Sequence, residues 1–208
     1  MKKLLVILAV LVVFIIIVIA TAGGSYNRHV KQSQGVDSQW AQVQNVYQRR
    51  ADLIPNLVST VSGAANFEKS TLTDVVEARA SVGQVKINAN SAPTDPAQLA
   101  AFQSAQGQLG SALSRLLVVS ERYPNLTATQ NFRDLQAELE GTENRISVER
   151  RDFNTAVQNY DTAVKSFPTV LYAGVFGFQP KPYFTADAGA ETAPKVSFDF
   201  NKPAGATN

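Results

Sequence analysis

The chain has 208 residues, 45% of them apolar, with 19 basic and 17 acidic side chains and a formal net charge of +2. Residues 1–20 hold 18 apolar residues, and without Lys2 and Lys3 the remaining charges cancel at 17 basic and 17 acidic. Nucleic-acid binding needs basic residues in excess, so no nucleic-acid partner is expected, and the absence of cysteine excludes disulfides, thiolate catalysis and cysteine-ligated zinc.

The first 24 residues are predicted to form a transmembrane anchor. Leu4 to Ala20 is an unbroken apolar run, and the segment up to Gly24 would make roughly 31 Å of helix, close to the hydrocarbon core of a bilayer. A signal peptide cleaved after Ala22 is the alternative, because two lysines precede the run and small residues end it. The length of the run favours the uncleaved anchor.

Basic residues on either side of this anchor predict its orientation. Lys2, Lys3 and the amino terminus precede it, and Arg28 and Lys31 follow it. Because cytoplasmic flanks carry more Lys and Arg, the slight excess before the anchor favours a cytoplasmic N-terminus and an extracytoplasmic main domain. The expected location is the cell membrane, with a single pass.

Four segments with helical apolar spacing follow, and they predict an all-α fold. Residues 25–167 are expected to form an up-and-down bundle of four long antiparallel helices, whose apolar stripes face one another. Gly63 and Asn66 indicate a reversal after the first segment, and Pro124 should stop the third at Tyr123. If residues 33–87 formed one helix, the bundle would have three helices. The four segments are 36–64, 68–87, 96–123 and 128–167.

The chain beyond Phe167 and Pro168 is rich in aromatic residues, glycine and proline. Residues 168–200 are predicted to be an extended strap and residues 201–208 a disordered tip. Four alternating helices would bring this tail back to the membrane, where amphipathic aromatic side chains are favoured; packing across the bundle end is the alternative, which the glycines favour. The side chains concerned are Tyr172, Phe176, Phe178, Tyr183 and Phe184, with Lys181 beside them.

Several sequence blocks together resemble the LemA family of bacterial membrane proteins. The most specific is Arg49-Arg50-Ala51-Asp52-Leu53-Ile54-Pro55-Asn56-Leu57-Val58, and others include Glu138-Leu139-Glu140-Gly141-Thr142-Glu143-Asn144 and Ala173-Gly174-x-Phe176-Gly177-Phe178. The resemblance spans nearly the whole chain and implies one N-terminal span followed by a four-helix bundle. It implies no activity, because members have no established biochemical role. A site that often reads Tyr-x-x-His-Glu in the family is Ala64, Phe67, Glu68 here, so any role of that histidine is absent.

Arg50 is a cation on an otherwise apolar stripe. An unpaired buried charge is very costly, so Arg50 requires a carboxylate, and the fourth helix offers Glu149 on its own stripe as well as Glu140 and Glu143. Such a pair would fix helix register; a ligand or partner groove at a kink caused by Pro55 is the alternative. The candidate interaction or register residues in the helices are therefore Arg49, Arg50, Asp52, Pro55, Asn56, Glu143 and Glu149.

No residue pattern predicts catalysis, a cofactor or a metal site. His29, the only histidine, has no partner at ligand spacing and is expected to be solvated near the membrane interface. The charges of residues 138–151 are expected to form a solvated, salt-bridged face rather than a pair of catalytic carboxylates. Phosphate-loop, serine-elbow and dinucleotide-glycine patterns are missing.

The sequence thus predicts a membrane-anchored scaffold or adaptor that presents a rod-like bundle to protein partners at the cell envelope, with self-association as a further expectation. The alternative is a lipid or small-ligand binding module that uses the kink at Pro55 and the aromatic tail. A cavity between Pro55 and the tail would favour this module. A solid core with a broad apolar surface patch would favour the adaptor.

Overall fold

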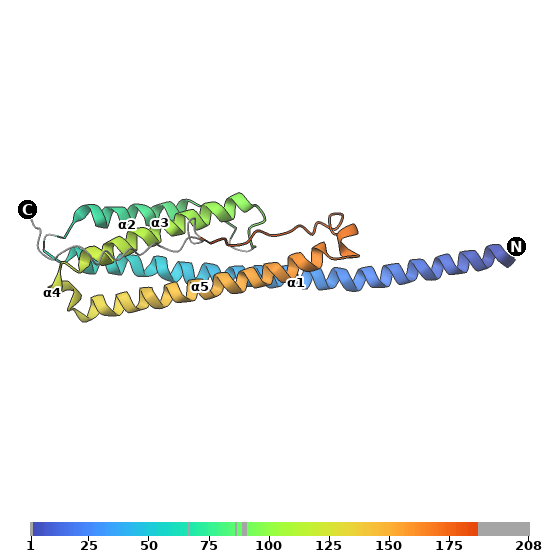
Figure 1. Ribbon diagram of the computed structural model, residues 1–208, viewed down its shortest axis with the longest axis horizontal. Helices are drawn as coiled ribbons and strands as arrows, with labels where there is room; N and C mark the ends of the chain where they lie inside the picture. Colours follow the sequence, from blue (N-terminus) through green and yellow to red (C-terminus); the bar gives the residue numbers. More distant parts are fainter. Residues whose placement is uncertain (1, 66, 86, 89–90, 187–208) are drawn as a thin grey trace, which may run out of the picture.

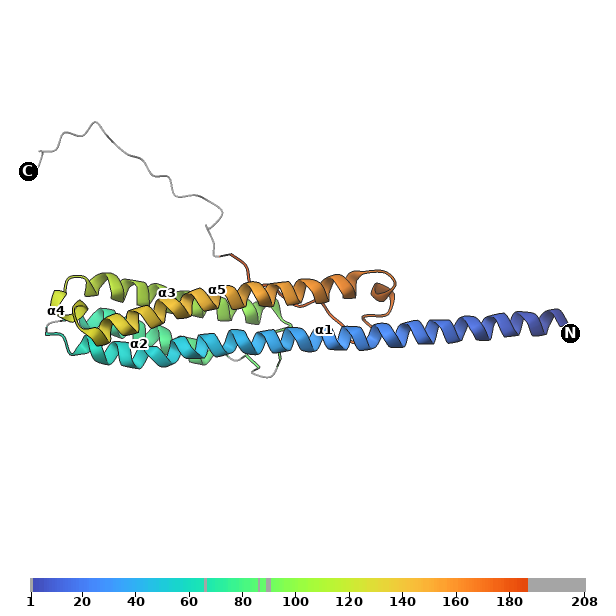
Figure 2. The same ribbon diagram turned by 90° about the horizontal axis from the view of Figure 1, so that it is seen from below.

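The computed structural model describes residues 2–65, 67–85, 87–88 and 91–186, and this part of the chain is all-helical, as predicted. The four long helices alternate in direction (Figures 1 and 2), so the described chain forms a bundle of four helices and not three. The helices are α1 (Lys2–Ser62), α2 (Lys69–Gln84), α3 (Pro96–Ser120), the short α4 (Pro124–Thr127) and α5 (Gln130–Lys165), followed by a 3₁₀ turn, η1 (Thr169–Leu171).

The helices associate as two pairs. α1 packs antiparallel against α5, and α2 packs against α3 as a hairpin that lies alongside them (Figures 1 and 2). Residues 2–24 of α1, here called the stem, project beyond the other helices, and the end of the bundle around residues 25–29 is the stem end. The opposite end, where α4 lies, is the far end.

The stem and the bundle share one helix, because α1 continues through Pro55 to Ser62 without a break. Among the described residues, no helix has both the length and the apolar character required to cross a bilayer. The side chains of residues 14–22, in the middle of the predicted anchor, lie outside the described part.

Local sequence signals set the ends of α3. Asp95 caps its N-terminus, because the side-chain Oδ1 accepts a hydrogen bond from the backbone N–H of Ala97 at 2.8 Å. The helix ends at Ser120, three residues before the predicted stop at Tyr123, and Pro124 then opens α4. The short α4 makes the turn into α5 at the far end (Figure 1).

Buried apolar side chains form two clusters along the bundle. The Trp40 cluster, toward the stem end, is built on the Trp40 ring, whose centroid lies 5.5 Å from those of Phe102 and Phe153. The Leu57 cluster occupies the far end. Its largest fully buried members include Ile54, Leu57, Leu109, Leu116 and Phe132.

The tail after α5 does not run extended from its start. Residues 169–177 form η1 and a series of turns at the stem end, and extended chain begins at residue 178 (Figure 1). The prediction of an extended strap over 168–200 is therefore wrong for its first ten residues. Residues 187–208, including the predicted disordered tip, lie outside the described residues.

The tail covers the part of α1 and α5 that the α2–α3 hairpin does not reach. The loop between α2 and α3 is held at Asp37, whose Oδ1 accepts a hydrogen bond from the backbone N–H of Ala92 at 2.9 Å. The face of α1 that carries the buried His29 and Val36 is thus covered by the tail in place of a second helix pair.

Candidate functional site

A layer of polar side chains separates the two apolar clusters. Arg50 of α1 is only 4% exposed and reaches both α3 and α5. Its Nη1 donates to Glu143 Oε2 at 2.9 Å, and its Nη2 donates to the backbone oxygen of Gln106 at 3.2 Å and also to the Gln106 side-chain oxygen. Thr142 is buried beside them. Arg50, Gln106, Thr142 and Glu143 are here called the polar layer.

The polar layer joins three helices at one height. Because a buried guanidinium without partners is very costly, a sliding of α3 or α5 that broke these bonds would be strongly disfavoured. The Glu143 side chain is 58% exposed, so the carboxylate is partly solvated. Arg50 Nε has no hydrogen-bond partner among the described residues, which leaves one buried donor of the guanidinium unused.

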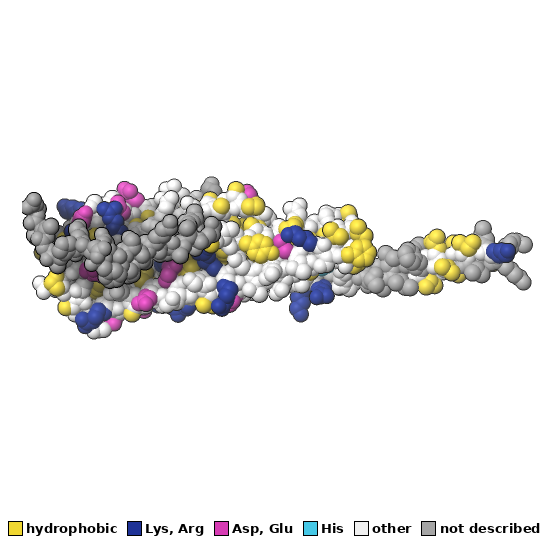
Figure 3. Space-filling view, viewed as in Figure 1, with side chains coloured by type: hydrophobic (Ala, Val, Ile, Leu, Met, Phe, Trp, Pro, Cys, Tyr) yellow, Lys and Arg dark blue, Asp and Glu magenta, His cyan; other side chains and the backbone are white. Residues whose placement is uncertain are grey.

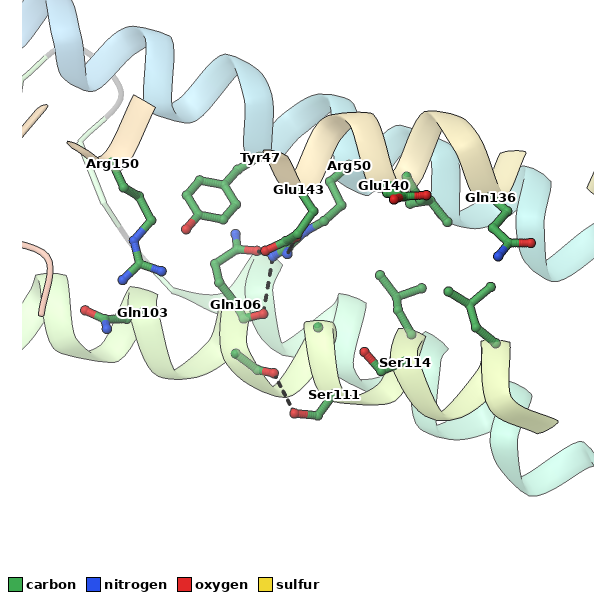
Figure 4. Close-up of a pocket in the computed structure, with 15 residues that line it drawn as sticks. Tyr47, Arg50, Gln103, Gln106, Ser111, Ser114, Gln136, Glu140, Glu143 and Arg150 are labelled. Atoms are coloured by element: carbon green, nitrogen blue, oxygen red, sulfur yellow. Dashed lines mark hydrogen bonds and ion pairs between the residues drawn. The ribbon is translucent and has the colours of Figure 1, made fainter. Parts of the chain in front are cut away.

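A cleft of about 830 Å³ opens onto this layer between α3 and α5 (Figure 4). Gln103 and Arg150 line it toward the stem end, and apolar residues such as Leu117 and Leu139 line it toward the far end. Half of the α3 residues that line the cleft are small. They are Gly107, Gly110, Ser111 and Ser114.

The small residues of α3 border open space rather than a packed neighbour. A methyl group added at Gly107 would meet no atom within 4 Å, and one at Gly110 would meet only Arg50 Nη1, at 4.0 Å. Neither glycine is required for close packing inside the bundle. The cleft is therefore an accessible trough with a polar wall around Arg50 and an apolar far half.

The remaining candidates from the Arg50 block lie outside the cleft. Arg49 Nη2 pairs with Glu138 Oε2 at 3.4 Å on the surface, and Asp52 Oδ1 accepts from Gln48 Nε2 at 2.7 Å. The exposed members of the block are Arg49, Asp52, Pro55 and Asn56. Of this predicted set, the structure brings together only Arg50 and Glu143.

Glu149 is not the partner of Arg50. Its Oε2 accepts a hydrogen bond from Gln39 Nε2 at 3.1 Å, and it lies six residues, about 9 Å along a helix, from Glu143. Glu140 lines the cleft. The apolar spacing alone therefore favoured the wrong residue of α5 as the partner of Arg50.

The predicted salt-bridged face of residues 138–151 also differs at one position. Arg150 Nη2 donates to the backbone oxygen of Thr185 at 2.9 Å, and its guanidinium lies over the Phe184 ring, 4.9 Å from the centroid. Arg150 therefore holds the tail against α5 and forms one wall of the cleft.

Three aromatic residues of the tail pack beside α1 at the stem end. The Tyr172 hydroxyl donates to Ser25 Oγ at 2.7 Å. The Tyr26 ring lies 5.5 Å from that of Phe176 and 5.4 Å from that of Phe178. These contacts place the turns of the tail next to the first residues of α1 after the stem.

Phe184 locks the extended part of the tail into the bundle. Its ring is 5% exposed and lies 6.1 Å from that of Trp40. Asn154 of α5 holds the backbone of Phe184. The Asn154 Oδ1 accepts a hydrogen bond from the Phe184 N–H, and the Asn154 Nδ2 donates one to the Phe184 carbonyl, both at 2.9 Å.

Tyr183, by contrast, is 40% exposed. Burial, followed by the Asp161 charge, raises the pKa of Tyr183, and Lys165 opposes the increase.

A second polar group, which the sequence patterns did not predict, ties the tail to α1 and α5. Lys181 Nζ donates to Asp37 Oδ1 at 2.8 Å, and the Lys181 backbone N–H donates to Asp161 Oδ1 at 2.9 Å. Asp161 lies at helical spacing from Val157 and Val164, which are both buried. An acidic residue at a buried position of the helix was therefore the available sequence signal, just as a basic residue at a buried position was the signal for Arg50.

The prediction that His29 is solvated is wrong. His29 is 2% exposed, because Thr169 and Phe178 of the tail fold over it. Its Nε2 shares hydrogen bonds with the hydroxyls of Ser25 and Thr169, each at 3.1 Å, and its Nδ1 has no partner among the described residues. His29 lies seven residues before Val36 on the same helix face, which was the signal for its burial.

Pro55 and the aromatic tail do not share a pocket. The tail contacts α1 between Ser25 and Trp40, and Pro55 lies fifteen residues further along, roughly 22 Å at the rise of a helix. Within the described residues, no three His, Cys, Asp or Glu side chains converge as metal ligands. The residues that line the cleft offer charged groups, hydrogen-bonding groups and apolar side chains.

Comparison with known proteins agrees with the resemblance seen in the sequence. Two MamQ magnetosome proteins of Paramagnetospirillum magneticum are each 26% identical over 196 residues, which cover 84% of this chain and 70% of theirs. A MamQ magnetosome protein of Magnetospirillum gryphiswaldense is 24% identical, and the match covers 90% of this chain and 74% of that protein. Protein LemA of Metamycoplasma hominis is 22% identical, covering 70% of this chain and 62% of its own. The LemA family profile matches residues 39–198, and the chain belongs to the LemA family.

Proposed function

We propose that this chain is a membrane-anchored scaffold or adaptor, without catalytic activity, that binds a segment of a protein partner in the cleft between α3 and α5. The stem would hold it in the cell membrane with a single pass, and the bundle would present the cleft at the cell envelope. The observation that carries the proposal is the open trough beside the polar layer.

The composition of the cleft suits a peptide or helix of mixed polarity. Arg50 and Arg150 supply two cations, and Glu140 and Glu143 supply two carboxylates, so a partner segment that carries both an acidic or carbonyl group and a basic group would be favoured there. Leu117 and Leu139 would receive an apolar side chain in the far half. The small residues of α3 allow a backbone to approach closely, as in helix-in-groove recognition.

The membrane part of the proposal rests on the side chains of the stem. Leu5, Ile7, Leu8 and the four residues 10–13 are apolar and between 46% and 65% exposed. A helix with apolar side chains on all sides needs an apolar surrounding, and a bilayer supplies one.

Two tryptophan substitutions on α3 test the cleft. Ser114 lines it, whereas Ser104 is also exposed on α3 but does not. Tagged full-length chains would be captured from detergent-solubilised membranes, with bound proteins quantified for wild type, Ser104→Trp and Ser114→Trp. A partner retained by Ser104→Trp and reduced tenfold or more by Ser114→Trp, about 1.4 kcal/mol, supports the proposal.

Equal capture by both variants contradicts a role of the cleft. Circular dichroism spectra and melting temperatures of the two proteins should match, which separates a blocked cleft from an unfolded bundle. The chain itself counts as a partner in this measurement, since a self-associating bundle would lose its second copy in the same way.

A further inference from the structure

We propose that the stem end of the bundle carries a lipid-binding face that lies in the headgroup region of the bilayer. Its side chains are Tyr26, Phe167, Val170, Leu171, Val175 and Phe176, here called the end face. The inference rests on the proposed membrane anchoring and goes further, because the folded domain itself, and not only the stem, would contact lipid.

The end face is the most exposed apolar surface of the described bundle. Val175 is 85% exposed, Phe167 80% and Leu171 72%, and the other three lie between 40% and 54%. Elsewhere on the described helices of the bundle, large exposed apolar side chains occur singly, as at Val76, Val118 and Val148. Single residues of this kind are ordinary, whereas a contiguous patch marks a contact surface. Figure 3 shows apolar side chains gathered where the bundle meets the stem.

The end face is held in place rather than formed by a loose loop. Tyr172 donates to Ser25, and Thr169 shares a hydrogen bond with the buried His29, so the turns of the tail are fixed to α1 on both sides of Leu171. Tyr26 and Phe176 pack edge to face, at 5.5 Å with an interplanar angle of 65°. The apolar side chains thus project from a preformed platform.

The height of the end face matches the membrane interface. Tyr26 lies two residues beyond Gly24, the end of the predicted span, which is about 3 Å along the helix. Each headgroup region of a bilayer is roughly 5–8 Å thick. The residues packed against Tyr26 would therefore lie beside lipid headgroups, where tyrosine and other amphipathic aromatic side chains are favoured.

The charge around the end face favours lipid, rather than a second copy of the chain, as what binds there. Residues 23–36 and 162–180, which build the stem end, contain Arg28, Lys31 and Lys165 and no acidic residue. Lys165 pairs with Asp161, which directly precedes the second stretch, at 3.1 Å, so the positive charge of this end comes mainly from Arg28 and Lys31. All three basic residues are exposed. Anionic headgroups attract such residues near the surface, whereas a symmetric contact between two copies would bring like charges together.

Labelled cysteines test this placement cleanly, since the natural chain has no cysteine. Val175→Cys and the matched control Val118→Cys, at a site 66% exposed on α3, would each carry an environment-sensitive fluorophore. The full-length proteins would be reconstituted into phosphatidylcholine–phosphatidylglycerol vesicles with bromine near the top of the acyl chains. Emission from position 175 is expected to fall by roughly half or more, and that from position 118 to change by less than about a tenth.

Each other outcome overturns the inference in a different way. If the chain floats with the vesicles but neither label is quenched, the end face does not contact lipid, although the anchoring stands. If the chain does not float, the membrane anchoring itself fails. If unlabelled Val175→Cys chains form disulfide-linked dimers on oxidation in the vesicles, and brominated lipid does not quench the labelled chains, the face contacts a second copy.

Discussion

Neighbouring arginines in α1 occupy opposite environments. The Arg50 side chain is 5% exposed and bonded to two helices, whereas Arg49 is 59% exposed in a surface pair with Glu138. Exposed pairs contribute about 0–1 kcal/mol, and a buried acceptor that loses its donor costs roughly 1–3 kcal/mol. The two positions therefore form a matched pair for measuring what the polar layer contributes.

Replacing Arg50 by Met should lower the free energy of unfolding by about 1–3 kcal/mol, because the buried Gln106 side chain loses its partner. Arg49→Met should cost less than about 1 kcal/mol. Urea unfolding of the full chain in detergent, followed by circular dichroism, measures both. Adding Gln106→Leu to Arg50→Met should restore part of the loss, because no buried amide is then left unpaired.

The Arg50 variant also separates a register role from a partner role. A changed oligomeric state or a loss of unique packing indicates that Arg50 sets helix register. A stable bundle that no longer captures its partner indicates that the guanidinium contacts that partner. Equal destabilisation by the Arg49 and Arg50 variants would contradict the difference in environment described above.

Tyr160 should make the bundle sensitive to high pH. Burial, followed by the neighbouring Asp161 and more weakly Asp37, raises its pKa above the ordinary value of 10.0, although a hydrogen bond to the backbone of Gln179 opposes this. Between the unfolded and the folded pKa, the folded state retains a proton that the unfolded state has lost, so stability falls as pH rises. Below pH 10 this contribution is fully present.

Tyr160→Phe should therefore flatten the loss of stability above pH 10. Melting temperatures measured between neutral pH and the alkaline range, for wild type and the variant, provide the test. Tyr26→Phe is the control, because Tyr26 is 40% exposed whereas Tyr160 is 2% exposed. An unchanged alkaline slope in Tyr160→Phe would show that other groups cause the loss.

At the stem end, the tail covers α1 and α5 where the α2–α3 hairpin does not reach. Two of its aromatic contacts differ in burial: the Phe184 ring fills the Trp40 cluster, whereas the Phe176 ring is 51% exposed in the end face. Removal of a buried phenylalanine costs about 3–5 kcal/mol, and removal of a half-exposed one costs far less. The tail should therefore detach when the first is removed and remain attached when the second is.

Phe184→Ala is expected to destabilise the chain by about 3 kcal/mol and to release residues 178–186 to proteolysis. Trp40 is the only tryptophan, so its emission reports directly on the loss of the neighbouring ring and should shift to the red. Phe176→Ala should leave both readouts near wild type. A tail that stays protected in Phe184→Ala would place the main attachment at Lys181 instead.

The sequence was sufficient for the elements that depend on local signals. Apolar spacing, the glycine after α1 and the prolines at 96 and 124 predicted the end of α1 and the bounds of α2, α3 and α5 to within a few residues. The start of α1 was not predicted, because the helix continues without a break from the stem through residues 25–35. The turns of the tail were not predictable in the same way, because they depend on contacts more than a hundred residues away. The spacing of His29 from Val36 indicates a buried helix face, but it does not indicate which segment covers it. Thr169, for example, is 140 positions from the histidine that it contacts.

The same distinction applies to the candidate site. A cation on the buried face of a helix indicates that a carboxylate is needed. Which residue of α5 supplies that carboxylate depends on how far α5 is displaced along α1. Which helices pair is not encoded in the stripes either, and the cleft exists because α1 packs with α5 and α2 with α3. Arg50 and Glu143 were therefore identifiable, whereas Gln106, Arg150 and the small residues of α3 were not.

At the scale of the whole molecule, a single helix joins the predicted anchor to the cleft. From residue 25 to Arg50, α1 rises about 37 Å, so a partner would meet the polar layer well above the bilayer surface. The lipid-binding face proposed for the stem end would hold this rod at a fixed tilt, since the bundle would contact the membrane beside the stem as well as through it.

Orientation of the molecule can be tested with one exposed cysteine. Ser104→Cys, on the surface of α3, should react with a membrane-impermeant maleimide in intact cells, because Lys2 and Lys3 at the start of the stem favour a cytoplasmic N-terminus. Adding Lys2→Gln and Lys3→Gln should reduce the labelled fraction, since Arg28 and Lys31 would then dominate the charge bias. Labelling only after permeabilisation would reverse the predicted orientation and place the cleft in the cytoplasm.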